Sequence, residues 1–261
     1  MIGLEQKLES IYLKYNKREY VDPDPLLFLY NYSDKKNCEI AGFIAACFAY
    51  GRVGMIMKTV DTILGKLKPT PIKYILSRTK KDIAHDFKGF KYRFAKDTHL
   101  TDLLWGIKIV LNRFSSLEDC FYSAWSPNDE TIIPGLSFLC EQIREKREIG
   151  HLLADPGKKS ACKRSHLFLR WMVRKDLVDP GGWDKISPSQ LIVPLDTHMY
   201  KTGLVLNFTK RKSRDIKTAL EITRGFKNIS PHDPVKYDFC LTRFGIRQEL
   251  DMDQLKKRIV N

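Results

Sequence analysis

Residues 156–172 read PGKKSACKRSHLFLRWM and carry the strongest structural signal in the chain. A Pro-Gly turn precedes a helical pattern, predicted to start near Ser160, in which basic side chains recur along one side. Apolar side chains fall on the opposite side of the same pattern. We therefore expect a helix that buries its apolar face and presents a basic stripe, made up of Lys159, Lys163, His166, Arg170 and Arg174.

The charge of this stretch is one-sided. No Asp or Glu occurs from Gly157 to Lys175, whereas a helix whose basic face served only solubility would usually interleave acids with its cations. A solvated basic face is one interpretation, and a surface that binds an anionic partner is the other. The absence of acids favours the second interpretation.

The composition of the whole chain agrees with a folded protein that has an anionic partner. Its 261 residues are 43% hydrophobic, which is enough for a core and excludes a disordered basic tail. Lys and Arg number 45 against 31 Asp and Glu, so the formal net charge is 45 − 31 = +14. The excess is concentrated in the C-terminal part of the chain, as is typical of a surface for nucleic acid.

Compartment signals favour the cytoplasm. The most apolar run, residues 40–50, is shorter than the roughly 20 residues of a membrane helix, so we expect no membrane contact. The N-terminal residues include acids and no cleavage site of small residues, so no signal peptide is expected. The six cysteines are scattered without a CxxC pair, which predicts reduced, buried thiols.

Helical periodicity dominates the rest of the chain, and strand signals are few. The sequence therefore predicts an all-α fold. The predicted helical stretches are residues 39–67, turned at Gly51 and Gly54, and residues 100–114, 117–125 and 133–147.

One segment departs from helical spacing. Residues 87–94, FKGFKYRF, alternate aromatic and basic side chains and are expected to form a short extended segment. Such a segment can stack on the bases of a single strand. A buried aromatic edge with solvated lysines is the other reading, and it is the one we expect here.

Two aspartates mark predicted helix starts. Asp196 follows a loop rich in Pro, Gly and Ser and precedes an apolar helical pattern over residues 199–206, which is the position of an N-cap. Asp233 precedes Pro234 and predicts a second helix with proline in its first turn.

Taken together, these segments resemble the helix-hairpin-helix/Gly-Pro-Asp superfamily of DNA glycosylases. The resemblance lies in residues 156–172, in VPLDTHMYKTGLVL (193–206) and in IAGFIAACFAYGRVGMIMKTV (40–60). It is closest to an uncharacterised bacterial family of that superfamily, and the long loop is similar to the archaeal 8-oxoguanine branch. The resemblance implies one glycosylase-like unit over residues 1–261.

The resemblance also implies how that unit is arranged. It predicts two helical lobes, residues 39–150 and 151–261, with a helix-hairpin-helix-like motif and a cleft between the lobes. Residues 1–38 are expected to pack across them.

The resemblance gives Asp196 the position of the catalytic carboxylate. Cleavage of an N-glycosidic bond develops positive charge on the sugar, and an ionised carboxylate nearby stabilises that charge. Capping does not compete with this role, because the N-terminus of a helix favours the charged form of the acid that caps it.

The resemblance nominates two lysines as the nucleophile of a strand-cleaving lyase step. Lys159 lies in GKKSA, which is similar to the G-R-K-T-A run of the endonuclease III branch. Lys163 better fits the longer loop of the archaeal branch, and we favour it. Plain contact with phosphate is the alternative role for both lysines.

Further residues are implied to contact DNA. From the hairpin and the Asp196 segment these are Lys158, Arg164, Arg170, Arg174 and His198. Tyr50 or Arg52 stands where several members of the superfamily insert a side chain into the gap left by a flipped base.

Some features of the superfamily are missing from the chain. Only Pro156 and Gly157 precede the lysines, so the hairpin lacks its full L-P-G-(V/I)-G spacing. A single cysteine follows Asp196, which excludes the four-Cys iron–sulfur cluster. Asp196 and His198 lack a third metal ligand, so we expect neither a metal ion nor another cofactor.

The sequence thus predicts a monomeric, nucleoid-associated DNA glycosylase. Its expected partner is double-stranded DNA with a base lesion, and the expected lesion is an oxidised purine. A lyase activity would depend on the lysine. The alternative is a catalytically inactive DNA- or RNA-binding module on the same fold, and a helical scaffold whose charge serves solubility is a third reading.

Overall fold

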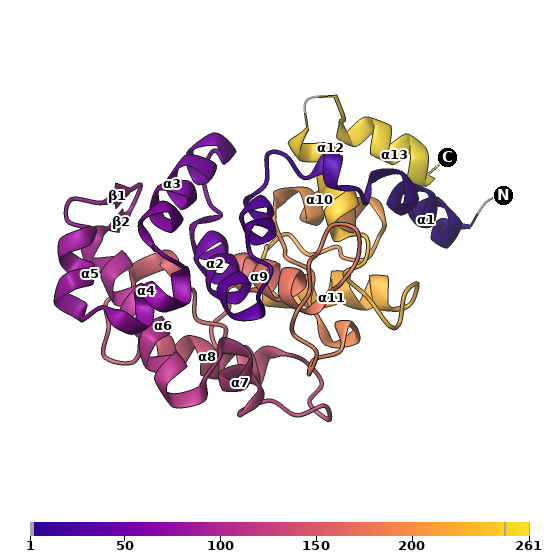
Figure 1. The fold of residues 1–261 in the computed structure, drawn as a ribbon. Coiled ribbons are helices and arrows are strands. Elements are labelled where there is room, and N and C mark those ends of the chain that lie inside the picture. Colours follow the sequence, from indigo (N-terminus) through magenta and orange to yellow (C-terminus); the bar gives the residue numbers. More distant parts are fainter. Residues whose placement is uncertain (1–2, 248, 261) are drawn as a thin grey trace. The chain divides into compact units, whose positions relative to one another are not determined.

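The computed structural model describes residues 3–247 and 249–260, and nearly all of its regular structure is helical (Figure 1), which confirms the all-α prediction. The chain forms two compact units. One contains residues Pro23–Lys158, and the other joins Met1–Asp22 to Lys159–Asn261.

This division differs from the lobes predicted at 39–150 and 151–261. Of the N-terminal residues 1–38, residues 1–22 belong to one unit and residues 23–38 to the other. The reason is packing of helix α1 (Leu4–Tyr15), which contacts helices α12 (Asp238–Ile246) and α13 (Met252–Val260). The ring of Tyr15 lies 5.2 Å from that of Phe244.

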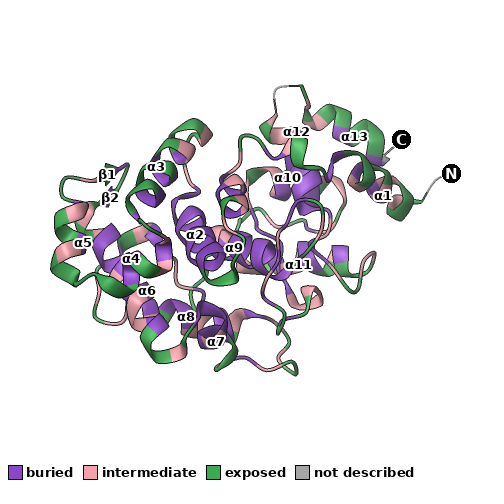
Figure 2. Cartoon of the chain, viewed as in Figure 1, coloured by how far each residue is buried: buried purple, intermediate pink, exposed green. Residues whose placement is uncertain are grey.

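The unit Pro23–Lys158 is built around helix α2 (Lys35–Phe48), in which every residue from Asn37 onward is buried (Figure 2). The chain turns at Gly51, which has a φ of +100°, and enters α3 (Val53–Lys66), as the sequence predicts. The remaining elements are α4 (Pro71–Ser77), α5 (Lys80–Asp86), strands β1 (Lys91–Tyr92) and β2 (Ala95–Lys96), α6 (Asp97–Phe114), α7 (Leu117–Tyr122), α8 (Ile133–Arg144) and the 3-10 segments Pro25–Asn31 and Gly150–Leu152.

A buried acid ties two helices of this unit together. Glu39 of α2 is fully buried, and its carboxylate accepts hydrogen bonds from the backbone N–H groups of Leu117 and Glu118 at 3.0 and 2.9 Å. Those amides form the first turn of α7 and have no partner within the helix. The charge of Glu39 is therefore satisfied by the N-terminus of α7.

The other unit contains residues 159–172 and 193–206, which belong to two of the three segments that resemble the glycosylase motifs. Beside α1, α12 and α13, its elements are α9 (Lys163–Val173), α10 (Thr197–Val205), α11 (Ile216–Lys227) and the 3-10 segments Arg18–Tyr20 and Pro188–Gln190. The helix predicted to open at Asp233-Pro234 is wrong in its start. Residues 234–237 form turns, and α12 begins only at Asp238.

Two sequence predictions can be compared directly with the fold. All six cysteines are free and buried, as expected. Over residues 3–247 and 249–260, the helices lack the combination of length and apolar character that a bilayer crossing requires.

Gly106 sets the approach of α6 to α8. An added Cβ at this position would lie 2.3 Å from the carbonyl oxygen of Ile143, so the helices can only pack this closely on a glycine. We expect Gly106→Ala to lower the free energy of unfolding by about 1–3 kcal/mol through overpacking.

Gly65 in α3 is the matched control. An added Cβ there meets no atom within 4 Å, so Gly65→Ala should instead stabilise the protein by about 0.4–1 kcal/mol. Urea denaturation of both variants tests the pair. Equal effects of the two substitutions would contradict the close helix contact.

Candidate active site

Helix α9 differs from its prediction in both its start and its burial. It begins at Lys163, because Cys162 adopts a left-handed conformation with a φ of +43°. Lys159 lies outside the helix, where its carbonyl accepts a hydrogen bond from the N–H of Ile216. The expected stripe therefore does not exist: every residue from Ser165 to Val173 is buried.

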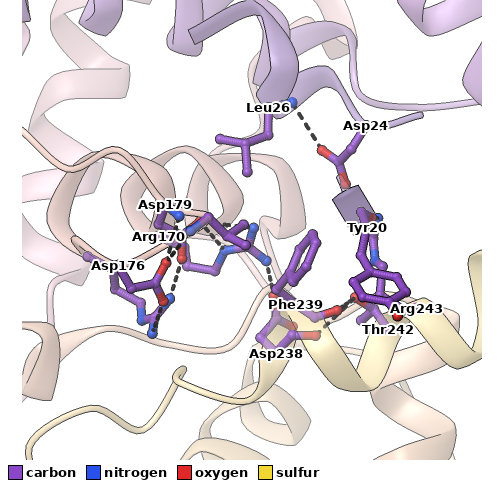
Figure 3. Close-up of polar contacts among 12 residues, drawn as sticks. Tyr20, Asp24, Leu26, Arg170, Asp176, Asp179, Asp238, Phe239, Thr242 and Arg243 are labelled. Carbon is purple, nitrogen blue, oxygen red and sulfur yellow. Dashed lines mark hydrogen bonds and ion pairs between the residues drawn. The ribbon is translucent and has the colours of Figure 1, made fainter. Parts of the chain in front are cut away.

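Arg170 of α9 and Arg174, which follows the helix as its C-cap, contact a cluster of acids that we call the Arg–Asp network. Figure 3 shows Arg170 with three of these acids, Asp176, Asp179 and Asp238. Arg170 contacts Asp238 at 2.5 Å and Asp179 at 3.2 Å. Arg174 also binds Asp179, so that carboxylate bridges both guanidinium groups. The network is completed by Asp233 and Asp176, each 2.9 Å from Arg174.

The prediction that Arg170 and Arg174 bind DNA is therefore wrong. Their relative exposures are 2% and 3%, and their guanidinium groups are occupied by aspartates of the same unit. A guanidinium needs a partner when it is removed from water, and here the protein itself supplies that partner. His166, in the same predicted stripe, is 1% exposed, and burial lowers its pKa to about 4.

Burial governs the titration of the network. The pKa of Asp179 is raised by burial, although the charges of Arg170 and Arg174 oppose the change. Burial also raises the pKa of Asp238 to about 6; Arg170 opposes this rise, and the carboxylate of Asp196 adds to it. Helix α12, which begins at Asp238, also packs against α10, whose N-cap is Asp196.

Asp196 is the N-cap of α10, as predicted. Its Oδ1 accepts hydrogen bonds from the N–H groups of His198 and Met199, both at 2.8 Å. The preceding residues 191–195 are buried, whereas Asp196 is partly exposed. Its Oδ2 accepts no hydrogen bond from the residues that the structure describes. The result is a carboxylate that is held by one oxygen and accessible through the other.

His198 packs against α12. An added Cβ at Gly245 would lie 1.8 Å from its Nδ1, so the imidazole rests directly on the glycine backbone. Nδ1 is buried and has no hydrogen-bond partner within the described residues. The predicted DNA contact of His198 is therefore restricted to the rest of its partly exposed ring.

The two candidate nucleophiles have different surroundings. Lys159 is exposed and lies in a bend next to Ser160, which pairs with Asp215. Lys163 is partly exposed and occupies the first turn of α9, followed by the partly exposed Arg164. Among the described residues, no acid forms an ion pair with either lysine. Both amines are therefore available for a ligand.

A residue that sequence reasoning missed connects these segments. Arg214 precedes Asp215, the residue that pairs with Ser160, and its Nη1 donates to Thr197 Oγ1 at 2.8 Å. The loop that starts with Lys159 and the head of α10 are thus both bound to residues 214–216. Asp179 and Asp176 were missed as well, and their position directly after the basic stretch was the available signal.

Three predicted contacts lie in the other unit. Lys158 is exposed, 3.8 Å from Asp155. Arg52 is exposed at the start of α3, and Tyr50 is partly exposed, with its hydroxyl donating to the carbonyl of Tyr92. Their binding to DNA stays a prediction. Over the described part of the chain, no group of three or more His, Cys, Asp or Glu side chains could hold a metal ion.

The raised pKa of Asp238 predicts a pH-dependent stability. The native state keeps a proton on Asp238 up to about pH 6, whereas an unfolded Asp loses it near pH 3.9. Unfolding between about pH 4 and 6 therefore releases a proton, and this residue's contribution to stability falls as the pH rises. Urea unfolding from pH 4 to 6 should show that the free energy of unfolding falls less steeply with rising pH in Asp238→Asn than in the wild type.

Asp184→Asn is the control, because Asp184 is exposed; it should follow the wild-type curve. Parallel pH curves for wild type and Asp238→Asn would contradict the assignment.

The contact of His198 with Gly245 predicts strong coupling. Gly245→Ala should destabilise the protein by about 1–3 kcal/mol, because the new methyl group and the imidazole cannot share the space. His198→Ala removes the clash, so the double variant should be more stable than the sum of the single effects by about 0.5–3 kcal/mol. Chemical denaturation of the four proteins measures this coupling, and simple additivity would exclude the contact.

Comparison with known proteins adds a family but no activity. None of the curated proteins and none of the solved structures matches the chain. The family described as "Protein of unknown function (DUF2400)" matches residues 24–247. Since this match covers most of the sequence, the chain belongs to the DUF2400 family.

Proposed function

We propose that the protein is a DNA glycosylase that excises a damaged base from double-stranded DNA, with Asp196 as its catalytic carboxylate. The proposed lesion is an oxidised purine. A cleft between two glycosylase-like lobes is part of the proposal, with Tyr50 or Arg52 filling the gap that the flipped base leaves.

One observation carries the proposal: Asp196 is both fixed and accessible. Two backbone amides hold Oδ1, while Oδ2 is left for a ligand. Preorganised charge of this kind stabilises a transition state without reorganisation during the reaction. An acid that served only as a cap would need no such opening, although capping alone explains the two hydrogen bonds.

The Arg–Asp network supports Asp196 from within the protein. Arg170 neutralises Asp238, the buried carboxyl on which Asp196 acts electrostatically. Without this guanidinium, two neighbouring carboxylates would repel each other, and one of them would be driven to bind a proton. Arg170 is therefore a positioning residue in the proposal and makes no contact with DNA.

The proposed reaction breaks the bond between C1′ of the sugar and the base nitrogen. Positive charge develops on the sugar ring, and Asp196 stabilises it. In the hydrolytic reaction, the oxygen of water bonds to C1′ and a proton from that water ends on the departing base. In the lyase reaction, the amine of Lys163 or Lys159 takes the place of water, forms a Schiff base and promotes cleavage of the strand.

A panel of lesion-containing duplexes tests both reactions: release of the base reports the glycosylase reaction, and borohydride trapping reports the Schiff base of the lyase reaction. Wild-type protein should release the base from at least one lesion, and reduction should link the protein to that DNA. Lys163→Gln should abolish the link if Lys163 is the nucleophile, and Lys159→Gln should abolish it otherwise. Asp196→Asn should lower the rate of base release by at least about 100-fold.

Asp215→Asn is the matched control for the carboxylate, because Asp215 caps α11 as Asp196 caps α10. Asparagine caps as well as aspartate, so both variants should keep their helices. Only Asp196→Asn should lose activity. Salt-sensitive duplex binding without release of any base would contradict the enzyme and support the inactive DNA- or RNA-binding module.

A further inference from the structure

A tight hairpin in the unit Pro23–Lys158 holds an aromatic ring in solvent. Strands β1 and β2 pair through Tyr92 and Ala95, which leaves Arg93 and Phe94 as a two-residue turn. Phe94 is 71% exposed, the largest exposed fraction given for any large apolar side chain in the described residues. The expectation of a buried aromatic edge is therefore wrong for Phe94, although Phe87 and Tyr92 are buried.

Contacts of the residues next to Phe94 hold the turn in place. Arg93 adopts a left-handed backbone conformation, with a φ of +52°, which is uncommon for residues with a side chain and is found mainly in tight turns. The hydroxyl of Tyr92 donates to the carbonyl of Tyr50, and the hydroxyl of Tyr50 donates back to the carbonyl of Tyr92 at 3.3 Å. An added Cβ at Gly51 would lie 2.8 Å from Arg93, so the hairpin packs directly on that glycine.

The ring of His151 contacts both Tyr50 and Phe94 and so connects the segment around Gly51 with the turn. The ring of His151 lies 4.8 Å from that of Tyr50 and 5.6 Å from that of Phe94, edge to face in both cases. Arg93 lies over the ring of Phe94 at 5.8 Å. Burial of a phenylalanine side chain is favourable, and this fold leaves the ring of Phe94 mostly in solvent.

Cations are frequent in and beside the hairpin that carries the exposed ring. Within the described residues none of them forms an ion pair, and all are exposed: Arg52, Lys88, Lys91, Arg93 and Lys96. The only acid of residues 88–97 is Asp97, whose carboxylate accepts hydrogen bonds from the N–H groups of Gly89 and Thr98. The hairpin therefore presents a flat apolar group in a field that attracts anions.

We propose that this hairpin binds single-stranded nucleic acid, with an unpaired base stacked on Phe94 and the backbone phosphates held by the exposed cations in and beside the hairpin. Base-on-aromatic stacking combined with a basic surface is how proteins hold single strands without reading their sequence. A duplex fits less well, because its base faces are covered by their neighbours and must be unstacked at a cost before a ring can reach them.

Fluorescence anisotropy with a short labelled thymidine oligonucleotide tests the proposal. Phe94→Ala should weaken binding by about 5- to 150-fold, the range measured for loss of one stacked base. Phe94→Tyr keeps a flat ring and should bind like the wild type. On an oligonucleotide of abasic residues, which keeps the phosphates and removes the bases, wild type and Phe94→Ala should bind equally.

Two control variants separate stacking from other effects. Leu13→Ala removes a side chain that is 69% exposed next to Lys14, and it should leave binding unchanged. Lys91→Gln should weaken binding to normal and abasic oligonucleotides alike and lower the slope of log affinity against log salt by about 0.7. Equal loss for Phe94→Ala on both oligonucleotides, no loss on either, or an equal loss on a blunt duplex would overturn the proposal.

The inference does not depend on the proposed glycosylase. Asp196→Asn should bind the thymidine oligonucleotide like the wild type. If the protein releases a base but Phe94→Ala binds the thymidine oligonucleotide like the wild type, only the hairpin proposal is contradicted. If the protein binds single strands through Phe94 but releases no base, only the glycosylase proposal is contradicted.

Discussion

The unit that joins Met1–Asp22 to Lys159–Asn261, which we call the C-terminal unit, depends on the ion pairs that Arg170 and Arg174 form with Asp179. Asp179 is fully buried, and its two oxygens face the guanidinium groups of Arg170, in the last turn of α9, and of Arg174, the residue that follows this helix. Removing charged groups from water is costly unless each one finds a partner. The loop after α9 and the start of α12 must therefore fold back onto this helix, which brings Asp238 under the head of α10.

The same network explains why the basic face of α9 is buried although the sequence predicts that it is exposed. A row of cations at helical spacing looks the same whether it faces water or buried acids, because the spacing reports a face and not its surroundings. The partners lie further along the chain, at Asp179, Asp233 and Asp238. The stretch without Asp or Glu also ends at Lys175, and the next residue is Asp176, a member of the network. Only the fold brings these acids to the arginines.

Local features were predictable where local interactions decide them. The cap at Asp196 depends on amides two and three residues away, and the turn at Gly51 depends on its own backbone. The exposure of Phe94 was not predictable in the same way. It follows from a two-residue turn that packs on Gly51 and Tyr50, which are more than forty residues earlier in the sequence. Alternation of aromatic and basic residues cannot reveal that distant support.

The discontinuous make-up of the C-terminal unit has a consequence for synthesis on the ribosome. The unit Pro23–Lys158 is contiguous and has all its residues once Lys158 has emerged. Helix α1, by contrast, precedes that unit in the chain, while its partners α12 and α13 are made only after it. The apolar side chains of Leu8, Ile11 and Tyr15 therefore lack these partners until residues 238–260 have emerged, and apolar surface exposed in this way makes a nascent chain prone to aggregation.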